Sequence, residues 1–173
     1  MRVGSVHQDS YTGATLRILE TAQTSGGAVT VFELRAPEGW SAGPLHVHPH
    51  QVEAMTVLEG ALELSCSGHR SVLGVRGHGE VSKGAVHTAR NVGVGPLLMR
   101  VEFRPALRTA DLFVKMFGGA GRRPPKLVPA ALRGLVESIG YRDEIRYLWP
   151  GAVVGTLVGL AAAAAVVRGQ LRP

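Results

Sequence analysis

The amino-acid sequence predicts a mainly β fold, a sandwich or barrel of short strands followed by C-terminal α-helices. Three observations support this prediction. Short segments of the first 105 residues alternate apolar and polar side chains, as half-buried strands do. Turns rich in glycine separate these segments, and none of the segments has the 3.6-residue period of an amphipathic helix. Beyond Pro105 the spacing of apolar residues becomes helical, which favours one domain with a C-terminal extension.

The alternating segments predict eight strands in order along the chain. These strands cover residues 15–21, 28–35, 45–48, 52–58, 61–67, 71–75, 86–91 and 97–104. Gly26 and Gly27 separate the first two segments and indicate a hairpin turn. Glycines between residues 74 and 79 indicate a turn rather than a strand.

The charged residues divide the chain near residue 105. Up to that point nine Lys and Arg balance nine Asp and Glu, whereas residues 106–173 carry ten and four, a net charge of +6. All seven histidines lie in the first part, and the single cysteine, Cys66, excludes an intrachain disulfide and a cysteine-based zinc site. We therefore predict an N-terminal arm at 1–13, a barrel at 14–105 and a basic helical tail at 106–173, and we expect residues 1–105 to fold on their own.

Three histidines and one glutamate form the most informative pattern. His46 and His48 point to the same face of a strand, because side chains two residues apart lie on one side of it. Glu53 begins the next predicted strand, and His87 lies in a later one. Three imidazoles and a carboxylate can hold a first-row transition metal ion and leave positions open for water or substrate.

An apolar wall is predicted around these four residues. Met55 and Val57 follow Glu53 in the same strand, and Leu62 lies in the next strand.

The spacing of these residues resembles the two sequence motifs of the cupin superfamily. The first motif corresponds to His46, His48, Glu53 and Gly60, and the second to Gly84, His87 and Asn91. The resemblance covers roughly residues 14–104 and implies a single double-stranded β-helix, or jelly-roll, barrel. It also implies that His46, His48, Glu53 and His87 bind a divalent transition metal ion such as Fe, Mn, Ni or Zn. Gly60 would then form a turn with positive φ.

The second motif departs from the family pattern. Ser82 stands where the family usually has a proline, and Gly77 and Gly79 flank His78 where a regular apolar strand is expected. We therefore expect the strand before His87 to be weak.

Other polar residues of the barrel receive no role in metal binding. His50 follows the strand-breaking Pro49, and His69 and His78 lie in turn-rich segments, so none of the three is expected to be a ligand. Asn91 is expected to cap a turn.

The tail predicts two helices and a long apolar segment. Helices are expected at 111–117 and 127–139, and residues 147–167 carry no charge and are flanked by arginines. Tyr147 and Trp149 stand at the start of this segment, where interfacial aromatic residues occur in membrane proteins. At 1.5 Å per residue the segment is about 30 Å long, which matches a bilayer core.

The tail is compatible with two cellular locations of the protein. Either the segment 147–167 anchors a cytoplasmic barrel to the membrane, or it is a helix that packs on the barrel or across a dimer interface of a soluble cytoplasmic protein.

The resemblance implies two classes of function. The first is a metal-dependent enzyme, oxygenase-like, that acts on a small organic molecule and uses Glu53 as a base. The alternative is a non-catalytic module that binds or senses a small molecule and is tethered by its tail. Single-domain cupins often pair, which implies a homodimer. No nucleic-acid-binding motif accompanies the basic tail, so no nucleic acid partner is expected.

Overall fold

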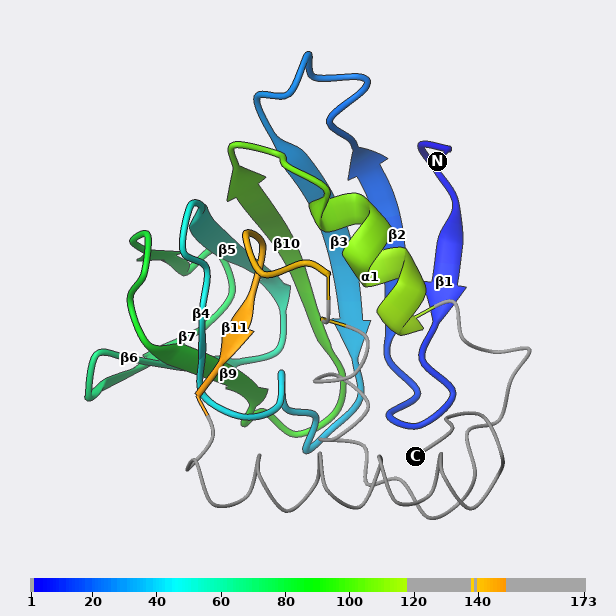
Figure 1. Cartoon of the computed structure of the whole chain (residues 1–173). Helices are drawn as coiled ribbons and strands as arrows, with labels where there is room; N and C mark the ends of the chain where they lie inside the picture. The colour runs from blue at the N-terminus through cyan, green and yellow to red at the C-terminus, as the bar shows by residue number, and fades with distance from the viewer. Residues whose placement is uncertain (1, 118–137, 139, 149–173) are drawn as a thin grey trace, which may run out of the picture.

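A computed structural model describes residues 2–117, 138 and 140–148 of the chain, and it confirms the mainly β fold. Two antiparallel sheets make up this part of the protein (Figure 1). The six-stranded sheet has the order β1 (Val6–Gln8), β2 (Thr15–Glu20), β3 (Thr30–Ala36), β10 (Leu97–Arg104), β5 (Val52–Glu59) and β8 (His78–Val81). The five-stranded sheet has the order β11 (Arg146–Tyr147), β4 (His46–Val47), β9 (His87–Asn91), β6 (Leu62–Cys66) and β7 (His69–Leu73). The single helix described, α1 (Thr109–Phe117), lies beside β1 and β2.

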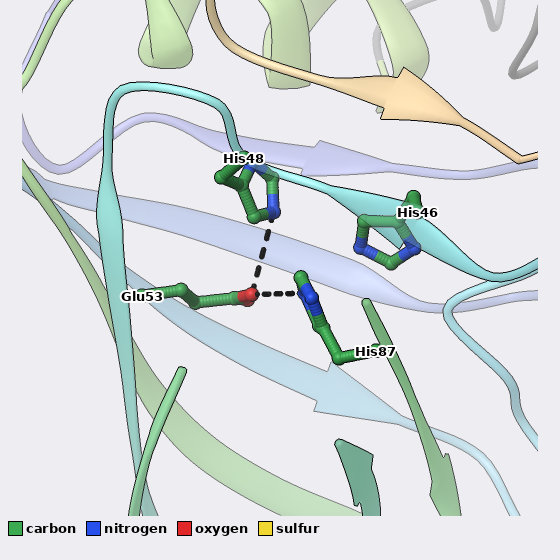
Figure 2. Close-up of side chains that lie close together, drawn as sticks. All are labelled: His46, His48, Glu53 and His87. Atoms are coloured by element: carbon green, nitrogen blue, oxygen red, sulfur yellow. Dashed lines mark hydrogen bonds and ion pairs between the residues drawn. The ribbon is translucent and has the colours of Figure 1, made fainter. Parts of the chain in front are cut away.

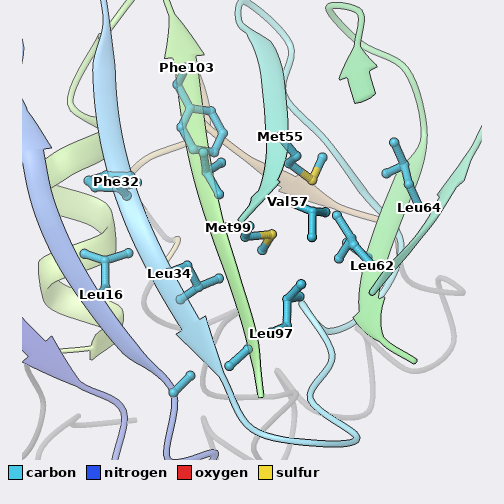
Figure 3. Close-up of a cluster of buried hydrophobic side chains, with 14 of the residues drawn as sticks. Leu16, Phe32, Leu34, Met55, Val57, Leu62, Leu64, Leu97, Met99 and Phe103 are labelled. Atoms are coloured by element: carbon cyan, nitrogen blue, oxygen red, sulfur yellow. The ribbon is translucent and has the colours of Figure 1, made fainter. Parts of the chain in front are cut away.

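The core lies between the two sheets because alternate residues of their strands point inward. In β10, Leu97, Met99, Val101 and Phe103 are buried, whereas the residues between them are more exposed. The buried side chains of β2, β3 and β5 join this row, and those of β6 and β9 come from the facing sheet. Figure 3 shows the row from β10 together with Leu62 and Leu64 of β6. The core thus ties both sheets into one hydrophobic unit.

All eight predicted strands form, and three further strands join them. The unpredicted strands are β1, β8 and β11. Strand β8 forms although the sequence indicates a turn and a weak strand, and it pairs with β5 over four residues. A Cβ atom at Gly79 would lie 2.9 Å from Leu73 Cδ1 and 3.0 Å from Leu64 Cδ2. The glycine therefore lets β8 approach two leucine side chains of the other sheet and is compatible with the strand.

Gly60 forms the predicted turn, with a φ of 84°. A Cβ atom at this position would lie 2.7 Å from the main-chain oxygen of Pro96. Gly68 has nearly the same φ, 83°, but no atom lies within 4 Å of its added Cβ. The two glycines thus share one backbone conformation and differ in their surroundings.

We expect Gly60→Ala to lower the free energy of unfolding more than Gly68→Ala. The strained backbone alone costs about 1–2 kcal/mol at either site, and only Gly60→Ala adds a clash with main-chain atoms, which cannot rotate away. Urea unfolding of the two variants measures the difference. Equal losses would show that the turn near Pro96 relaxes freely.

Residues outside the predicted barrel limits of 14–105 also contribute to the fold. Strand β1 pairs with β2, and β11 pairs with β4, so both ends of the described chain extend the sheets. In and beyond α1, Leu112 and Ile145 are buried. The predicted helix at 111–117 is present as α1. A chain that ends at 105 would lose these contacts, although its ability to fold stays a prediction.

Most of the predicted tail lies outside the described residues. This holds for the helix predicted at 127–139, apart from residue 138, and for the apolar segment 147–167, apart from its first two residues. Within the part of the chain that the structure describes, no helix is long and apolar enough to cross a membrane.

Candidate metal centre

Four side chains from three strands and one loop meet at one point of the barrel (Figure 2). His46 lies on β4 and is the cross-strand partner of His87 on β9. His48 directly follows β4, and Glu53 lies on β5 of the other sheet. One nitrogen or oxygen atom from each of the four residues lies within 4.8 Å of all the others. The structure therefore brings together all four residues that the sequence singled out.

Main-chain carbonyl groups orient the three imidazole rings. His46 Nδ1 lies 2.9 Å from Pro44 O, and His87 Nδ1 lies 2.9 Å from Ala85 O. His48 Nδ1 lies 2.5 Å from Glu144 O. A carbonyl oxygen can only accept a hydrogen bond, so each Nδ1 carries the proton, and Nε2 is the nitrogen that can bind a metal ion. Partners of this kind fix the tautomer and the ring orientation of metal-binding histidines.

Glu53 is the acidic centre of the cluster. Its Oε2 lies 2.8 Å from His87 Nε2 and 3.3 Å from His48 Nε2. Burial by itself would raise the pKa of the Glu53 carboxyl, but hydrogen bonds and charge from the two histidines outweigh it and hold the pKa well below its usual range. Glu53 is therefore ionised, as a metal ligand must be.

The imidazoles respond in opposite directions to the same surroundings. Burial, assisted by the charge of His87, lowers the pKa of His46 to about 4, so its ring is neutral near pH 7. Burial also disfavours charge on His87, but the hydrogen bond and charge of Glu53 outweigh this effect and raise its pKa. Both nitrogens of His87 donate, so a metal ion at its Nε2 would displace a proton. The donor set suits a divalent transition metal ion, and the four residues form a candidate metal-binding site.

An apolar cavity of about 220 Å³ opens beside this cluster. His46, His48 and Glu53 line it, together with mainly apolar side chains. Of the three residues predicted to form its wall, Met55 lines the cavity, whereas Val57 and Leu62 are buried in the core elsewhere. Val57 has the same strand parity as Glu53, but four residues of β5 carry it about 13 Å away.

The remaining polar residues of the barrel lie outside the cluster. His50 is exposed and lies 3.7 Å from the carboxylate of Asp143. His69 and His78 are exposed on β7 and β8. As expected, Asn91 holds a turn: its amide donates to Pro37 O and Gly95 O, and its Oδ1 accepts from Gly93 N.

The segment 138–148 contributes to the site, which the sequence did not lead us to expect; we call its described part the C-terminal strap. Strand β11 pairs with β4, and Ile145 and Tyr147 line the cavity. The Tyr147 ring lies 5.7 Å from the ring of His46. Tyr147 therefore belongs to the barrel rather than to the start of a membrane segment. The alternation of Glu144, Ile145, Arg146 and Tyr147 is the signal that could have predicted this short strand.

Arg108 holds the strap from the segment that precedes α1. The side chain of Glu144 is buried, and its Oε1 accepts hydrogen bonds from Arg108 N and Nε. Arg108 also donates to Gly140 O and lies over the ring of Tyr141. These contacts place Glu144 O where it accepts the hydrogen bond of His48.

Residues 32–102 match the family model of the cupin domain, so the chain carries a cupin domain. No curated protein matches the chain in sequence. The family match spans both motifs and all four residues of the candidate metal site.

Solved cupin structures resemble the chain in fold. A protein from Thermotoga maritima, described as a predicted oxalate decarboxylase, shares 17% identity at a TM-score of 0.53; the similarity covers 60% of this chain and 96% of that one. An RmlC-like cupin from Shewanella frigidimarina shares 19% identity at a TM-score of 0.51, and the similarity covers 60% of this chain and 86% of that one. A double-stranded β-helix protein from Klebsiella pneumoniae shares 23% identity at a TM-score of 0.50, and the similarity covers 58% of this chain and 79% of that one. At these identities the similarity establishes the fold alone.

Proposed function

We propose that the protein is a metal-dependent enzyme, dioxygenase-like, that binds a divalent transition metal ion through His46, His48, Glu53 and His87 and acts on a small organic molecule. One observation carries the proposal. Three imidazoles, each oriented by a main-chain carbonyl, converge with a carboxylate at the wall of an apolar cavity. A purely structural cluster would not need an adjoining cavity.

The residues of the cluster divide the work between binding and proton transfer. The bound ion would supply Lewis-acid polarisation of a substrate oxygen or, if it is redox-active, electron transfer. His46 is neutral without a metal, so its Nε2 can bind an ion without losing a proton. Glu53 is ionised and lies within 3.3 Å of the Nε2 atoms of His87 and His48. It can therefore also act as the base of the reaction when it is not bound to the ion.

Elemental analysis of untagged protein, purified from minimal medium that contains several metals, tests this function first. We expect about one transition metal ion per chain. Dioxygen consumption by the metal-loaded protein with small organic substrates then tests turnover. Protein without stoichiometric metal contradicts the proposal. Metal binding with ligand binding but no turnover favours the alternative, a sensing module that uses the same cavity.

Membrane association through 147–167 and a homodimer are further proposals for this chain. They are supported by the uncharged segment with flanking arginines and by the similarity to single-domain cupins. Tyr147 pairs with His46 of β4, and Leu148 N donates a hydrogen bond to Leu45 O just before β4, so the segment available to a membrane begins after these two residues. If it spans, the larger arginine cluster before it places the barrel in the cytoplasm.

We expect an anchored protein to sediment with membranes, and Val158→Arg to release it, because a charge at mid-bilayer costs about 2.5–3.5 kcal/mol on insertion scales. Ultracentrifugation at low salt without detergent checks this. If the unmutated protein stays in the supernatant, the segment does not anchor it to a membrane. The alternative, a helix that packs on the barrel or across a dimer interface, then takes its place.

A further inference from the structure

The cavity next to the metal centre collects most of the aromatic side chains of the protein. The sequence contains four Phe, three Tyr and two Trp. The aromatic residues that line the cavity are Tyr11, Phe32, Trp40, Phe113, Phe117 and Tyr147. Met55, Met99 and Met116, which are all the methionines after Met1, also line it. Aromatic and methionine side chains make favourable contacts with aromatic rings, because ring edges attract ring faces and polarisable sulfur.

These side chains come from different parts of the fold and converge on one space. Phe32 belongs to β3, Met55 to β5 and Met99 to β10, whereas Phe113 and Met116 belong to α1. The ring of Phe113 lies 4.9 Å from that of Phe32, so the helix closes the cavity against the sheet. The aromatic wall is thus a product of tertiary packing and not of one sequence segment.

Positive charge is missing from this wall in the described part of the chain: no Lys or Arg is among the residues that line the cavity. Apart from the candidate metal ligands, Asp9 is the one charged side chain among the described residues that line the cavity. Its carboxylate accepts hydrogen bonds from Tyr11 N and Thr12 Oγ1 in its own loop. A ligand group with a second negative charge would therefore lie in an apolar space without an ion-pair partner, which is costly.

We propose that the cavity binds a compact molecule with a neutral aromatic body and a head of one or two oxygen atoms directed at the metal centre. This inference rests on the proposed metal binding and names the substrate class of that site. A small apolar cavity of about 150 Å³ is enough to hold benzene. The cavity here, at about 220 Å³, has room for one ring and a short polar substituent. Small dianions and phosphorylated sugars would find no Lys or Arg among the described residues of this wall.

Two hydroxamates with the same metal-binding head and different bodies test the proposal. Benzohydroxamate carries a phenyl ring where acetohydroxamate carries a methyl group, and oxalate serves as a dianionic chelator without an apolar body. We expect the metal-loaded protein to bind benzohydroxamate at least about tenfold more tightly than acetohydroxamate, since burial of the ring removes roughly 100 Å² of apolar surface from water. Isothermal titration measures the affinities. Equal affinities, or tighter binding of oxalate, would overturn the inference.

Fluorescence provides a readout at the cavity itself. Trp40 lines the cavity, and Trp149→Phe leaves it as the single tryptophan of the chain. We expect benzohydroxamate to change the emission of Trp40 in the metal-loaded protein. In metal-free protein we expect benzyl alcohol to change it at lower concentration than 1-propanol does. The metal-free comparison separates the two proposals. If the protein binds no metal but prefers the aromatic ligand, only the proposed metal function is contradicted. If the protein binds metal but does not prefer the aromatic ligand, only the proposed aromatic cavity is contradicted.

Replacing one of two alanines by leucine tests where the aromatic ring binds. Ala42 and Ala22 are both half-buried, but only Ala42 lines the cavity. We expect Ala42→Leu to weaken benzohydroxamate binding by at least about tenfold, because added side-chain volume competes with the ring for closely packed space. Acetohydroxamate binding and metal content should stay unchanged, as should all binding by Ala22→Leu. Unchanged benzohydroxamate affinity in Ala42→Leu would place the ring elsewhere. If Ala42→Leu does not fold, Met116→Ala, which enlarges the same cavity, is used as the test variant in its place.

Discussion

The variants His48→Ala and His87→Ala are expected to lose most of their bound metal while the barrel stays folded. Each change removes one Nε2 from a site whose donor atoms lie within 4.8 Å of one another. Loss of a partner that only orients a ligand typically costs 10–100-fold in affinity, so loss of the ligand itself should cost more than about 100-fold. Metal content by elemental analysis and circular dichroism of the same samples measure both effects.

His50→Ala is the matched control. His50 is close in sequence but exposed, and it lies beside Asp143 outside the cluster. Its replacement should leave the metal content unchanged. A site that loses metal in His50→Ala and keeps it in His87→Ala would show that the ligand assignment is wrong.

Arg108→Ala is expected to reduce both stability and metal affinity, although Arg108 does not touch the metal cluster. The change leaves the carboxylate of Glu144 buried with one donor fewer, and a second oxygen of this carboxylate, Oε2, has no hydrogen-bond partner in the described structure. An unsatisfied buried polar group costs about 1–3 kcal/mol. A looser strap also withdraws Glu144 O from His48, so metal affinity should fall about 10–100-fold.

Arg35→Ala is the corresponding control for this prediction. Arg35 pairs with Glu59 on the surface, where both side chains are about half exposed. Such pairs contribute about 0–1 kcal/mol, and this one is part of neither the strap nor the site. Urea unfolding and metal titration, the latter far below the unfolding midpoint, check both variants. Equal metal affinity in Arg108→Ala and the unmutated protein would show that the strap does not position His48.

The strands and the core were predictable because each depends on a local pattern. Period-two alternation in residues 97–104 places Leu97, Met99, Val101 and Phe103 on one face, and all four are buried in β10. Strand β8 escaped prediction because Gly77 before it and Gly79 within it resemble a turn in sequence. The two leucines that make a small residue suitable at Gly79 belong to β6 and β7 and are brought there only by the fold.

The sequence by itself determined which four residues could form a metal centre: strand parity pairs His46 with His48, and the resemblance to the cupin motifs adds Glu53 and His87. Only the tertiary structure decided what surrounds them. The hydrogen bond from His48 to Glu144 joins residues 96 positions apart, and the aromatic wall draws on β3, α1 and β11. Alternation within a segment records which face is buried, but it contains no information on which distant segment covers that face. That choice depends on how the two sheets, the helix and the strap pack together.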